Sequence, residues 1–485
     1  MCLNEEIAVK ISKKLVKRVL KVAFVVSCTF LLAKQVEANT VYKDLKPNKI
    51  RIINGNYAET YGGAIEVKYG ESQGDIIADF IHNSIWTNNA LYIFYTRGGA
   101  ISNEGTIKSI SGNFTENYIE ISKQGYGAAI YNAGTIGDIN SNFTDNYMDA
   151  GTGYGAAIYN SGSISNIIGD FIGNKAQTLT VQDGRGGAIY NIGNIGNISG
   201  KFYNNYASKG GAIFTTTNLQ ISADGSNEKT NLTDFSGNST TSGENNAIYV
   251  GANSTITLKS VNGGTVNFDD TINGSTKYNL KIQGDNTSKV ILNNSVINAN
   301  ASLTDTNLYI SERAFADTRT NLNANSGTVH FANGKSENYQ INQLTSLESV
   351  NYTVDVDLTK LAPVPDTIST GEGSSGTVTI SDINFNGELK DFNAQILKTQ
   401  DDNIQLGLSD NLKDKYNTTS TETIHTNDTV QANVNWKDKF NKYEQTNTTT
   451  TGLSLGTTNT TNDSIEYLTK TTEGEKIYQV QWAIR

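Results

Sequence analysis

A segment of twenty residues that recurs along the chain constrains the fold more than any other feature. Gly127 to Asn146 is representative: it begins with a glycine followed by Ala-Ala-Ile and ends with Phe-x-x-Asn. In the four most regular copies the Phe follows the Ile by 13 residues. These copies place Ile at Ile101, Ile130, Ile158 and Ile189, Phe at Phe114, Phe143, Phe171 and Phe202, and Asn at Asn117, Asn146, Asn174 and Asn205. A fixed period of this length indicates an array of stacked structural units.

The residue types within the repeat predict its architecture. Short β-prone runs such as Ala-Ile-Tyr are separated by Gly, Asn and Ser, and no helical period of 3.6 residues lies between them. Three short strands per repeat predict an all-β parallel β-helix, a single-stranded solenoid in which successive coils pair at a spacing of about 4.8 Å. A side chain that recurs once per repeat then meets its own kind, so the Ile and Phe residues are expected to form inner ladders. The Asn residues are expected at corners, because Asn tolerates left-handed backbone and its amides can hydrogen-bond along a stack.

The repeat also carries a family resemblance. Gly-Gly-Ala-Ile paired with Phe-x-x-Asn resembles the repeat signature of the polymorphic outer membrane protein branch of the autotransporters, the type V secreted proteins. About 210 of the 485 residues show it, although two copies have Gly127-Ala128 and Gly155-Ala156 in place of Gly-Gly. The resemblance implies a right-handed β-helical passenger domain that is exported to the bacterial cell surface, usually as an adhesin. It implies as partner a host or bacterial cell-surface protein or glycan, or another copy of the chain.

Residues 1–38 have the pattern of a secretory signal peptide cleaved after Ala38. A basic region is followed by the apolar run Val22 to Ala33 and by Val36-Glu37-Ala38. The apolar run of 12 residues is too short to span a bilayer, which needs about 20 residues. A lipoprotein signal is an open alternative, because the residues before Cys28 resemble a lipobox. The expected location is the bacterial cell surface, the outer membrane or the extracellular space.

Cysteine usage and charge narrow the class of partner further. Both cysteines, Cys2 and Cys28, lie in the predicted signal peptide, so the mature chain is expected to fold without a disulfide framework. The formal net charge of the chain is −10, and residues 1–38 carry seven basic and three acidic side chains, which leaves −14 on the remainder. Such a charge disfavours nucleic acid and anionic lipid as partners.

The sequence divides into segments by how regular the repeat is. We expect an N-terminal cap at 39–60, the regular β-helix at 61–270 and a less regular continuation at 271–410, where Gly-Thr-Val runs keep the alternation of polar and apolar residues. Residues 411–485 are rich in Thr and Asn. An autotransporter reaches the outer membrane through a β-barrel of amphipathic strands. No such series is recognisable here, so the chain is expected to be a truncated product or to depend on a barrel encoded elsewhere.

The segment between each Phe and the next Ile varies from 11 to 21 residues, and extra length is therefore predicted to project from one corner of the solenoid. The longest such segment, Ser84 to Arg97, contains Trp86, Tyr92, Phe94 and Tyr95. These aromatic residues are candidates for a ligand-binding platform. The alternative is that Leu91 to Tyr95 forms one more strand of the solenoid.

A second column of residues precedes the glycine pair. Its members are Tyr61, Arg97, Tyr126, Tyr154, Arg185 and Lys209. Cations stacked on aromatic rings of neighbouring coils would contribute about 0.5–1 kcal/mol each to stability. The functional alternative is a carbohydrate-binding stripe, because Tyr and Arg side chains suit the faces of sugar rings.

Catalytic signals are weak. His82, His330 and His425 are scattered, so no zinc site or serine triad can be assembled, and no cofactor is expected. The enzymatic alternative is a β-helical polysaccharide lyase or glycosidase, with Glu116 and Asp145 as two acids at the same position of adjacent coils. The pattern as a whole favours a binding protein over an enzyme.

Overall fold

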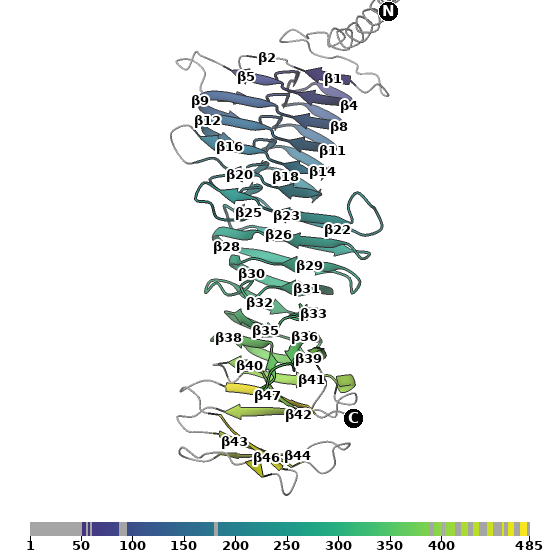
Figure 1. Ribbon diagram of the computed structural model, residues 1–485. Coiled ribbons are helices and arrows are strands. Elements are labelled where there is room, and N and C mark those ends of the chain that lie inside the picture. The colour runs from purple at the N-terminus through teal and green to yellow at the C-terminus, as the bar shows by residue number, and fades with distance from the viewer. Residues whose placement is uncertain are drawn as a thin grey trace, which may run out of the picture.

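The protein is an elongated rod of stacked coils (Figure 1). The computed structural model describes residues 51–412, except 55–56, 59–60, 87–94, 179–182, 388–391, 400 and 402, together with the backbone of six strands beyond residue 412. The predicted signal peptide and residues 39–50 of the predicted cap lie outside the described residues. Nearly all described elements are strands that pair in parallel with the equivalent strand one coil away, which confirms the predicted all-β parallel β-helix.

A representative coil contains a short strand β10 (Ile130–Asn132), a long strand β11 (Thr135–Thr144) and a strand β12 (Tyr147–Tyr154) that belongs to a second sheet. The other short strands are β3 (Ile65–Val67), β7 (Ile101–Asn103), β13 (Ile158–Asn160), β17 (Ile189–Asn191), β21 (Ile213–Thr215) and β25 (Asn246–Val250). The other long strands, some divided in two, are β1 (Arg51–Asn54), β4 (Ser72–Ile81), β8 (Thr106–Thr115), β14 (Ser163–Ile168), β15 (Phe171–Ile172), β18 (Asn194–Ser199), β19 (Lys201–Tyr203), β22 (Leu219–Asp224), β23 (Leu232–Ser236), β26 (Thr255–Val261) and β27 (Thr265–Phe268). The second sheet also contains β2 (Tyr57–Ala58), β5 (Ser84–Trp86), β6 (Tyr95–Arg97), β9 (Tyr118–Tyr126), β16 (Lys175–Thr178), β20 (Tyr206–Ala207) and β24 (Ser239–Thr240).

The core consists of ladders of identical side chains, as predicted. Phe143 pairs in register with Phe114 on one side and Phe171 on the other, with ring centroids 4.9 and 4.7 Å apart and ring planes within 8° of parallel. The Phe stack comprises Phe80, Phe114, Phe143, Phe171, Phe202, Phe235 and Phe268, and the Ile ladder comprises Ile65, Ile101, Ile130, Ile158, Ile189, Ile213 and Ile248, all of them buried. In-register parallel pairing places each repeat position directly over its equivalent, so one apolar residue per repeat becomes a continuous column.

The repeat Asn residues form buried hydrogen-bonded ladders. Asn117 Nδ2 donates to Asn146 Oδ1 over 2.9 Å and to the backbone carbonyl of Phe80 over 3.0 Å. The same pattern runs through Asn83, Asn117, Asn146, Asn174, Asn205 and Asn238, and a second ladder runs through Asn103, Asn132, Asn160 and Asn191. The amide ladder is thus as predicted.

The predicted reason for Asn at these corners was wrong in one respect. The left-handed backbone belongs to the residue before the Asn, as at Glu116 (φ 52°), Asp145 (φ 51°) and Asn204 (φ 55°), and not to the Asn itself. The chain turns the corner between the two sheets at that preceding residue, and the Asn side chain that follows is buried. There its oxygen accepts from the backbone N–H and the side-chain amide of the preceding coil.

The first glycine of each pair is required by backbone geometry. Gly127 has φ 62°, and a Cβ atom there would lie 2.0 Å from the carbonyl oxygen of Ile130. The second position holds Ala in the two copies that depart from Gly-Gly. Ala128 and Ala156 are buried in a small apolar cluster with Ile119 and Met148 of the second sheet.

The solenoid continues beyond the regular repeats through the described residues of 271–410, where three of its strands form a separate sheet and one pairs antiparallel. It contains β28 (Thr271–Gly284), β29 (Lys289–Leu292), β30 (Val296–Thr304), β31 (Thr306–Ile310), β32 (Asn321–Ala324), β33 (Gly327–His330), β34 (Asn338–Ile341), β35 (Gln343–Ser346), β36 (Val350–Asp357), β37 (Val364–Pro365), β38 (Thr367–Thr370), β39 (Ser375–Asn386), β40 (Phe392–Thr399) and β41 (Ile404–Leu408). At the other end, β1 and β2 from the segment predicted as a cap pair in parallel with β4 and β5. Arg51–Asn54 and Tyr57–Ala58 of the predicted cap are therefore already strands of the solenoid.

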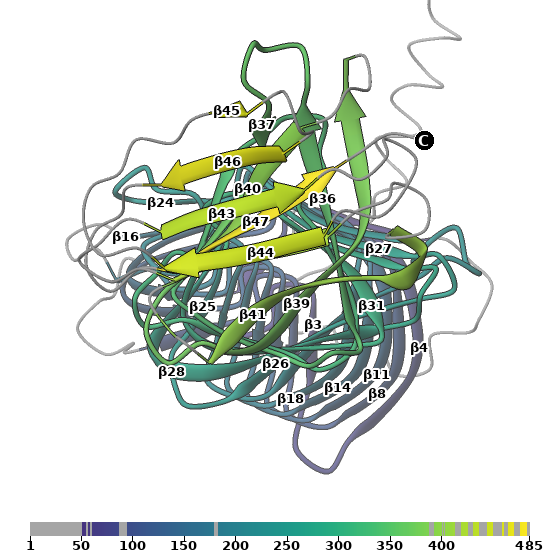
Figure 2. The ribbon, with the colours of Figure 1, turned by 90° about the horizontal axis from the view of Figure 1, so that it is seen from below.

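The strands beyond residue 412 pair differently. They are β42 (Thr419–Ile424), β43 (Val430–Asn435), β44 (Glu444–Thr449), β45 (Thr458–Asn459), β46 (Ser464–Thr469) and β47 (Lys476–Trp482). Strand β47 is antiparallel to both β40 and β42, and β43 is antiparallel to β44 and β46. Seen along the axis, β43, β44 and β46 lie across the end of the coils (Figure 2). This arrangement covers an open strand edge of the kind that solenoids need to protect.

Candidate ligand-binding surface

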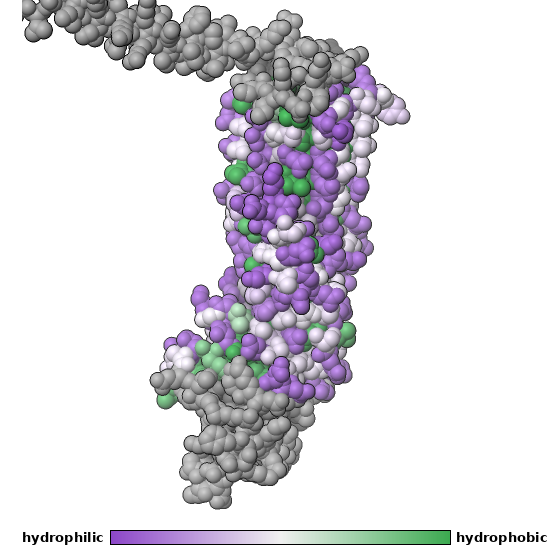
Figure 3. All heavy atoms as spheres, turned by 90° about the vertical axis from the view of Figure 1, so that its right-hand side faces the viewer, coloured by the Kyte–Doolittle hydropathy of each residue, from purple (hydrophilic) through white to green (hydrophobic). Residues whose placement is uncertain are grey.

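Two neighbouring columns of aromatic and cationic side chains run along the outside of the regular coils. We call them together the aromatic stripe. Its outer column is the predicted one, Tyr61, Arg97, Tyr126, Tyr154, Arg185 and Lys209, and adjacent members pair in parallel along the rod. Its inner column is Tyr131, Tyr159, Tyr190, Phe214 and Tyr249. Hydrophilic side chains dominate the face of the rod shown in Figure 3, so an ordered aromatic column on the exterior calls for an explanation.

The inner column follows from strand alternation. Each member comes directly after the buried Ile of its short strand, and successive side chains of a strand point to opposite faces. Tyr131, Tyr159 and Tyr190 therefore face outward, and in-register pairing stacks their rings at centroid distances of 5.2 and 5.4 Å. The Tyr of Ala-Ile-Tyr marks this column in the sequence. The sequence analysis predicted a strand from it but not a stacked column of rings.

The two columns pack against each other with an offset of one coil. Arg97 lies over the ring of Tyr131 at 4.8 Å, Tyr126 meets Tyr159 edge-to-face at 4.9 Å, and Arg185 lies over Phe214 at 5.4 Å. From Arg97 to Lys209, each outer residue thus packs on the inner residue of the next coil. Either a cation or a second ring can pack favourably on an aromatic face, which explains why Tyr, Arg and Lys alternate in the outer column.

Burial and ion pairs fix the charge state of the stripe. The inner rings are nearly inaccessible, with Tyr159 8% exposed, whereas Tyr126 and Tyr154 of the outer column are half-buried. Burial raises the pKa of the Tyr126, Tyr154 and Tyr159 hydroxyls, so they stay protonated at neutral pH. Arg185 donates two hydrogen bonds, of 2.9 and 3.0 Å, to Asp183. The accessible layer therefore presents phenol hydroxyls and held cations above a packed aromatic base.

The predicted aromatic insertion joins the N-terminal end of the stripe. Trp86 ends β5 and pairs with Glu120, and Tyr95 begins β6 and pairs with Gln124. Tyr95 is 40% exposed, and Arg97 lies 4.8 Å from its ring. Tyr92 and Phe94 lie outside the described residues. Both ends of the segment therefore belong to strands of the second sheet.

The structure places Glu116 and Asp145 at the same corner of adjacent coils, as predicted, whereas His330 lies in a different part of the rod. Glu116 contacts the imidazole of His82 in the preceding coil, and both residues occupy left-handed corners together with Asp145. His330 stacks on Tyr309 at 4.2 Å, and burial lowers its pKa to about 4. His425 lies outside the described residues. Within the part of the chain that the structure describes, no three His, Cys, Asp or Glu side chains are grouped so that they could hold a metal ion.

The chain matches no protein-family model, no curated protein and no solved structure. The resemblance to the polymorphic outer membrane proteins therefore rests on the repeat residues alone. No helix among the described residues is long and apolar enough to cross a membrane.

Proposed function

We propose that this chain is the β-helical passenger of an exported bacterial surface protein, that it acts as an adhesin, and that the aromatic stripe is its contact surface. The observation that carries the proposal is the continuity of the stripe over the regular coils of the rod. The partner is a host or bacterial cell-surface glycan or protein.

Packing alone accounts for the inner column of the stripe but not for the accessible part of the outer one. Tyr126 and Tyr154 stack on each other at 5.2 Å and are only half-buried, and the Tyr126 hydroxyl donates to Gln124 Oε1 over 2.7 Å. Rings of this kind provide flat contact area at low entropic cost, and phenol hydroxyls add directional hydrogen bonds. Aromatic and Arg side chains are also the residue types enriched in binding hot spots.

The rod geometry favours binding to a surface that carries many copies of its ligand. Equivalent stripe residues recur once per coil at a spacing of about 4.8 Å, so several weak contacts can form together along one axis. Linked contacts can raise the overall avidity by about 10²–10⁴ over a single contact. A long rod is also a suitable spacer between a cell and its target.

The proposal is tested by binding of the purified full-length chain to cells and to a glycan array. The double variant Tyr95→Ser/Tyr126→Leu removes two accessible rings while leaving an apolar cover over Tyr159, and we expect binding to weaken at least about tenfold. Tyr69 is 90% exposed and outside the stripe, so Tyr69→Ser is the matched control and should bind normally. Circular dichroism establishes that each variant keeps its β-sheet signal.

Unchanged binding by a folded double variant would leave the stripe a purely structural feature and remove the basis of this proposal. Sedimentation velocity separates the remaining case, in which the rod binds a second copy of itself. Export is tested independently, because a surface protein must be cleaved when intact cells are treated with protease.

A further inference from the structure

A groove opens on a different part of the coils from the aromatic stripe. It crosses the long strands two residues before the Phe stack, encloses about 470 Å³ and extends from Gly112 to Leu232 in sequence. Its floor is formed by small residues, one from each coil: Gly112, Ser141, Gly169 and Gly200. Asn113 to Lys201 span four coils, which corresponds to a length of about 14 Å along the axis.

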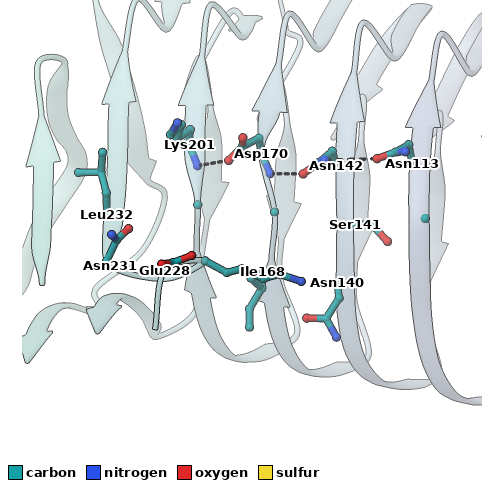
Figure 4. A pocket seen from close by; sticks show the side chains of 14 residues that line it. Asn113, Asn140, Ser141, Asn142, Ile168, Asp170, Lys201, Glu228, Asn231 and Leu232 are labelled. Atoms are coloured by element: carbon teal, nitrogen blue, oxygen red, sulfur yellow. Dashed lines mark hydrogen bonds between the residues drawn. The ribbon is translucent and has the colours of Figure 1, made fainter. Parts of the chain in front are cut away.

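One wall of the groove is a polar row on successive strands (Figure 4). Asn142 Nδ2 donates to Asn113 Oδ1 over 3.3 Å, and Asn142 Oδ1 accepts from the backbone N–H of Asp170 over 2.9 Å. Asp170 Oδ1 in turn accepts from the backbone N–H of Lys201 over 3.0 Å. The row is therefore held in place before any ligand arrives. Preorganised groups of this kind lose little entropy on binding.

Several polar groups in the groove have unused hydrogen-bonding capacity. Within the described residues, no hydrogen bond or ion pair engages the second carboxylate oxygen of Asp170, the ammonium group of Lys201 or the amide of Asn140. The hydroxyl of Ser141 also has no hydrogen-bond partner, but its oxygen is inaccessible and shares the core face of β11 with Ile139 and Phe143, so it is not offered to a ligand.

An insertion closes one end of the groove. Ile213 and Phe235 are 22 residues apart, against 13 in the regular copies. The extra residues form the loop between β22 and β23, which contributes Glu228, Lys229 and Asn231 to the groove. This loop lies between an Ile and the following Phe. The prediction that extra length occurs only between a Phe and the next Ile was therefore wrong. The two charged residues of the loop, like Asp170 and Lys201 in the wall, are oppositely charged, which makes the groove locally neutral.

We propose that this groove binds a neutral oligosaccharide lying along the axis of the rod. Each sugar hydroxyl can both donate and accept a hydrogen bond, which matches a lining of amides, carboxylates and ammonium groups. The balanced charges disfavour a polyanion. An extended peptide is disfavoured because β11 and its neighbours are paired on both sides, so the groove offers no free strand edge for main-chain recognition.

Isothermal titration calorimetry of the full-length chain tests the proposal. The probes are cellohexaose, mannohexaose and chitohexaose, with an acidic hexagalacturonate for comparison. We expect one neutral hexasaccharide to bind, and Lys201→Gln to weaken that binding about tenfold, because a hydrogen bond from a charged donor is lost. Asp170→Asn/Lys201→Gln should weaken it about 100-fold. Lys281 is exposed on β28 away from the groove, so Lys281→Gln is the matched control.

The outcomes separate this site from the aromatic stripe. Binding that is weakened by the groove variants but unaffected by Tyr95→Ser/Tyr126→Leu supports the groove whether or not the stripe binds cells. Glu228→Gln gives a second test at the loop, where a folding defect in the wall cannot interfere, and it should weaken binding about fivefold. No neutral hexasaccharide binding, binding of the acidic hexamer alone, or affinities unchanged in all groove variants would overturn the proposal. Capture of an extended peptide in place of a saccharide would do the same.

Discussion

The buried Asn ladder makes a sharp prediction about Asn146→Asp. Asn146 Oδ1 accepts from the backbone N–H and the side-chain amide of Asn117 over 3.1 and 2.9 Å, and an aspartate keeps both interactions. Asn146 Nδ2 donates to the carbonyl of Phe114 and to Asn174 Oδ1, both over 2.9 Å. An aspartate places a carboxylate oxygen against these two acceptors, so two buried hydrogen bonds become repulsive contacts.

The magnitude follows from those two contacts. Each acceptor left without its donor costs about 1–3 kcal/mol, and the buried charge adds to this, so we expect a loss of roughly 4–6 kcal/mol at pH 7. Burial and the two acceptors raise the pKa of the introduced carboxyl above its value in the unfolded chain. The variant is therefore least impaired at low pH and loses stability as the pH rises through the folded pKa. Urea unfolding followed by circular dichroism at pH 4.5 and pH 7 measures both effects.

The C-terminal end of the same ladder supplies the control. Asp270 accepts from the amide of Asn238 over 2.8 Å and from the backbone N–H of Gly237 over 3.1 Å. Asp270→Asn keeps the first interaction and loses the second, at a cost of about 1–2 kcal/mol. If Asn146→Asp were no more destabilising at pH 7 than Asp270→Asn, the amide ladder would not contribute to stability in the way argued here.

Two further predictions concern the core. Phe143→Ala should lower the free energy of unfolding in urea by about 3–5 kcal/mol, because the paired backbones beside the stack prevent the cavity from collapsing. The control Ile172→Ala, at a position 36% exposed, should lower it by less than about 1 kcal/mol. Equal effects would show that the Phe column is not packed as described. Burial and the nearby carboxylates of Asp355 and Glu337 raise the pKa of Asp366 to about 8 from an ordinary 3.8, so its contribution to stability is complete below pH 3.8 and is lost as the pH rises toward 8. Urea midpoints measured from pH 5 to 8.5 should therefore fall more steeply in the native chain than in Asp366→Asn, and equal slopes would contradict this pKa.

The interior of the rod could be predicted from the sequence because a parallel ladder turns a sequence period into a spatial column. Phe143 and Ile130 needed only their spacing to be placed in the core. The positions of the left-handed backbone could not be predicted from the spacing in the same way. Glu116 and Asp145 have side chains that do not favour φ above zero as strongly as Gly does, yet they hold the left-handed position at the corner that precedes the buried Asn.

The exterior was harder to predict because it depends on neighbouring coils. Arg97 packs on Tyr131, which belongs to the next repeat, and nothing in a single repeat states this offset. The groove is lined by one small residue per coil, such as Gly169 and Gly200, together with a loop from a coil further on. Neither arrangement follows from a single repeat position, because both depend on contacts between different positions in neighbouring coils.

Register explains where such a rod can vary and why its candidate surfaces lie there. Trp86 pairs with Glu120 and Tyr95 with Gln124, so Arg97 still pairs with Tyr126 although the chain from Trp86 to Tyr95 is longer than the chain from Glu120 to Gln124. The loop between β22 and β23 likewise returns in time for Phe235 to stack between its neighbours at 4.5 and 4.4 Å. Extra residues are tolerated wherever the chain recovers its register before the next core position. Both the aromatic stripe and the groove border such a segment, so a change in binding specificity can be made there without disturbing the ladders that hold the coils together.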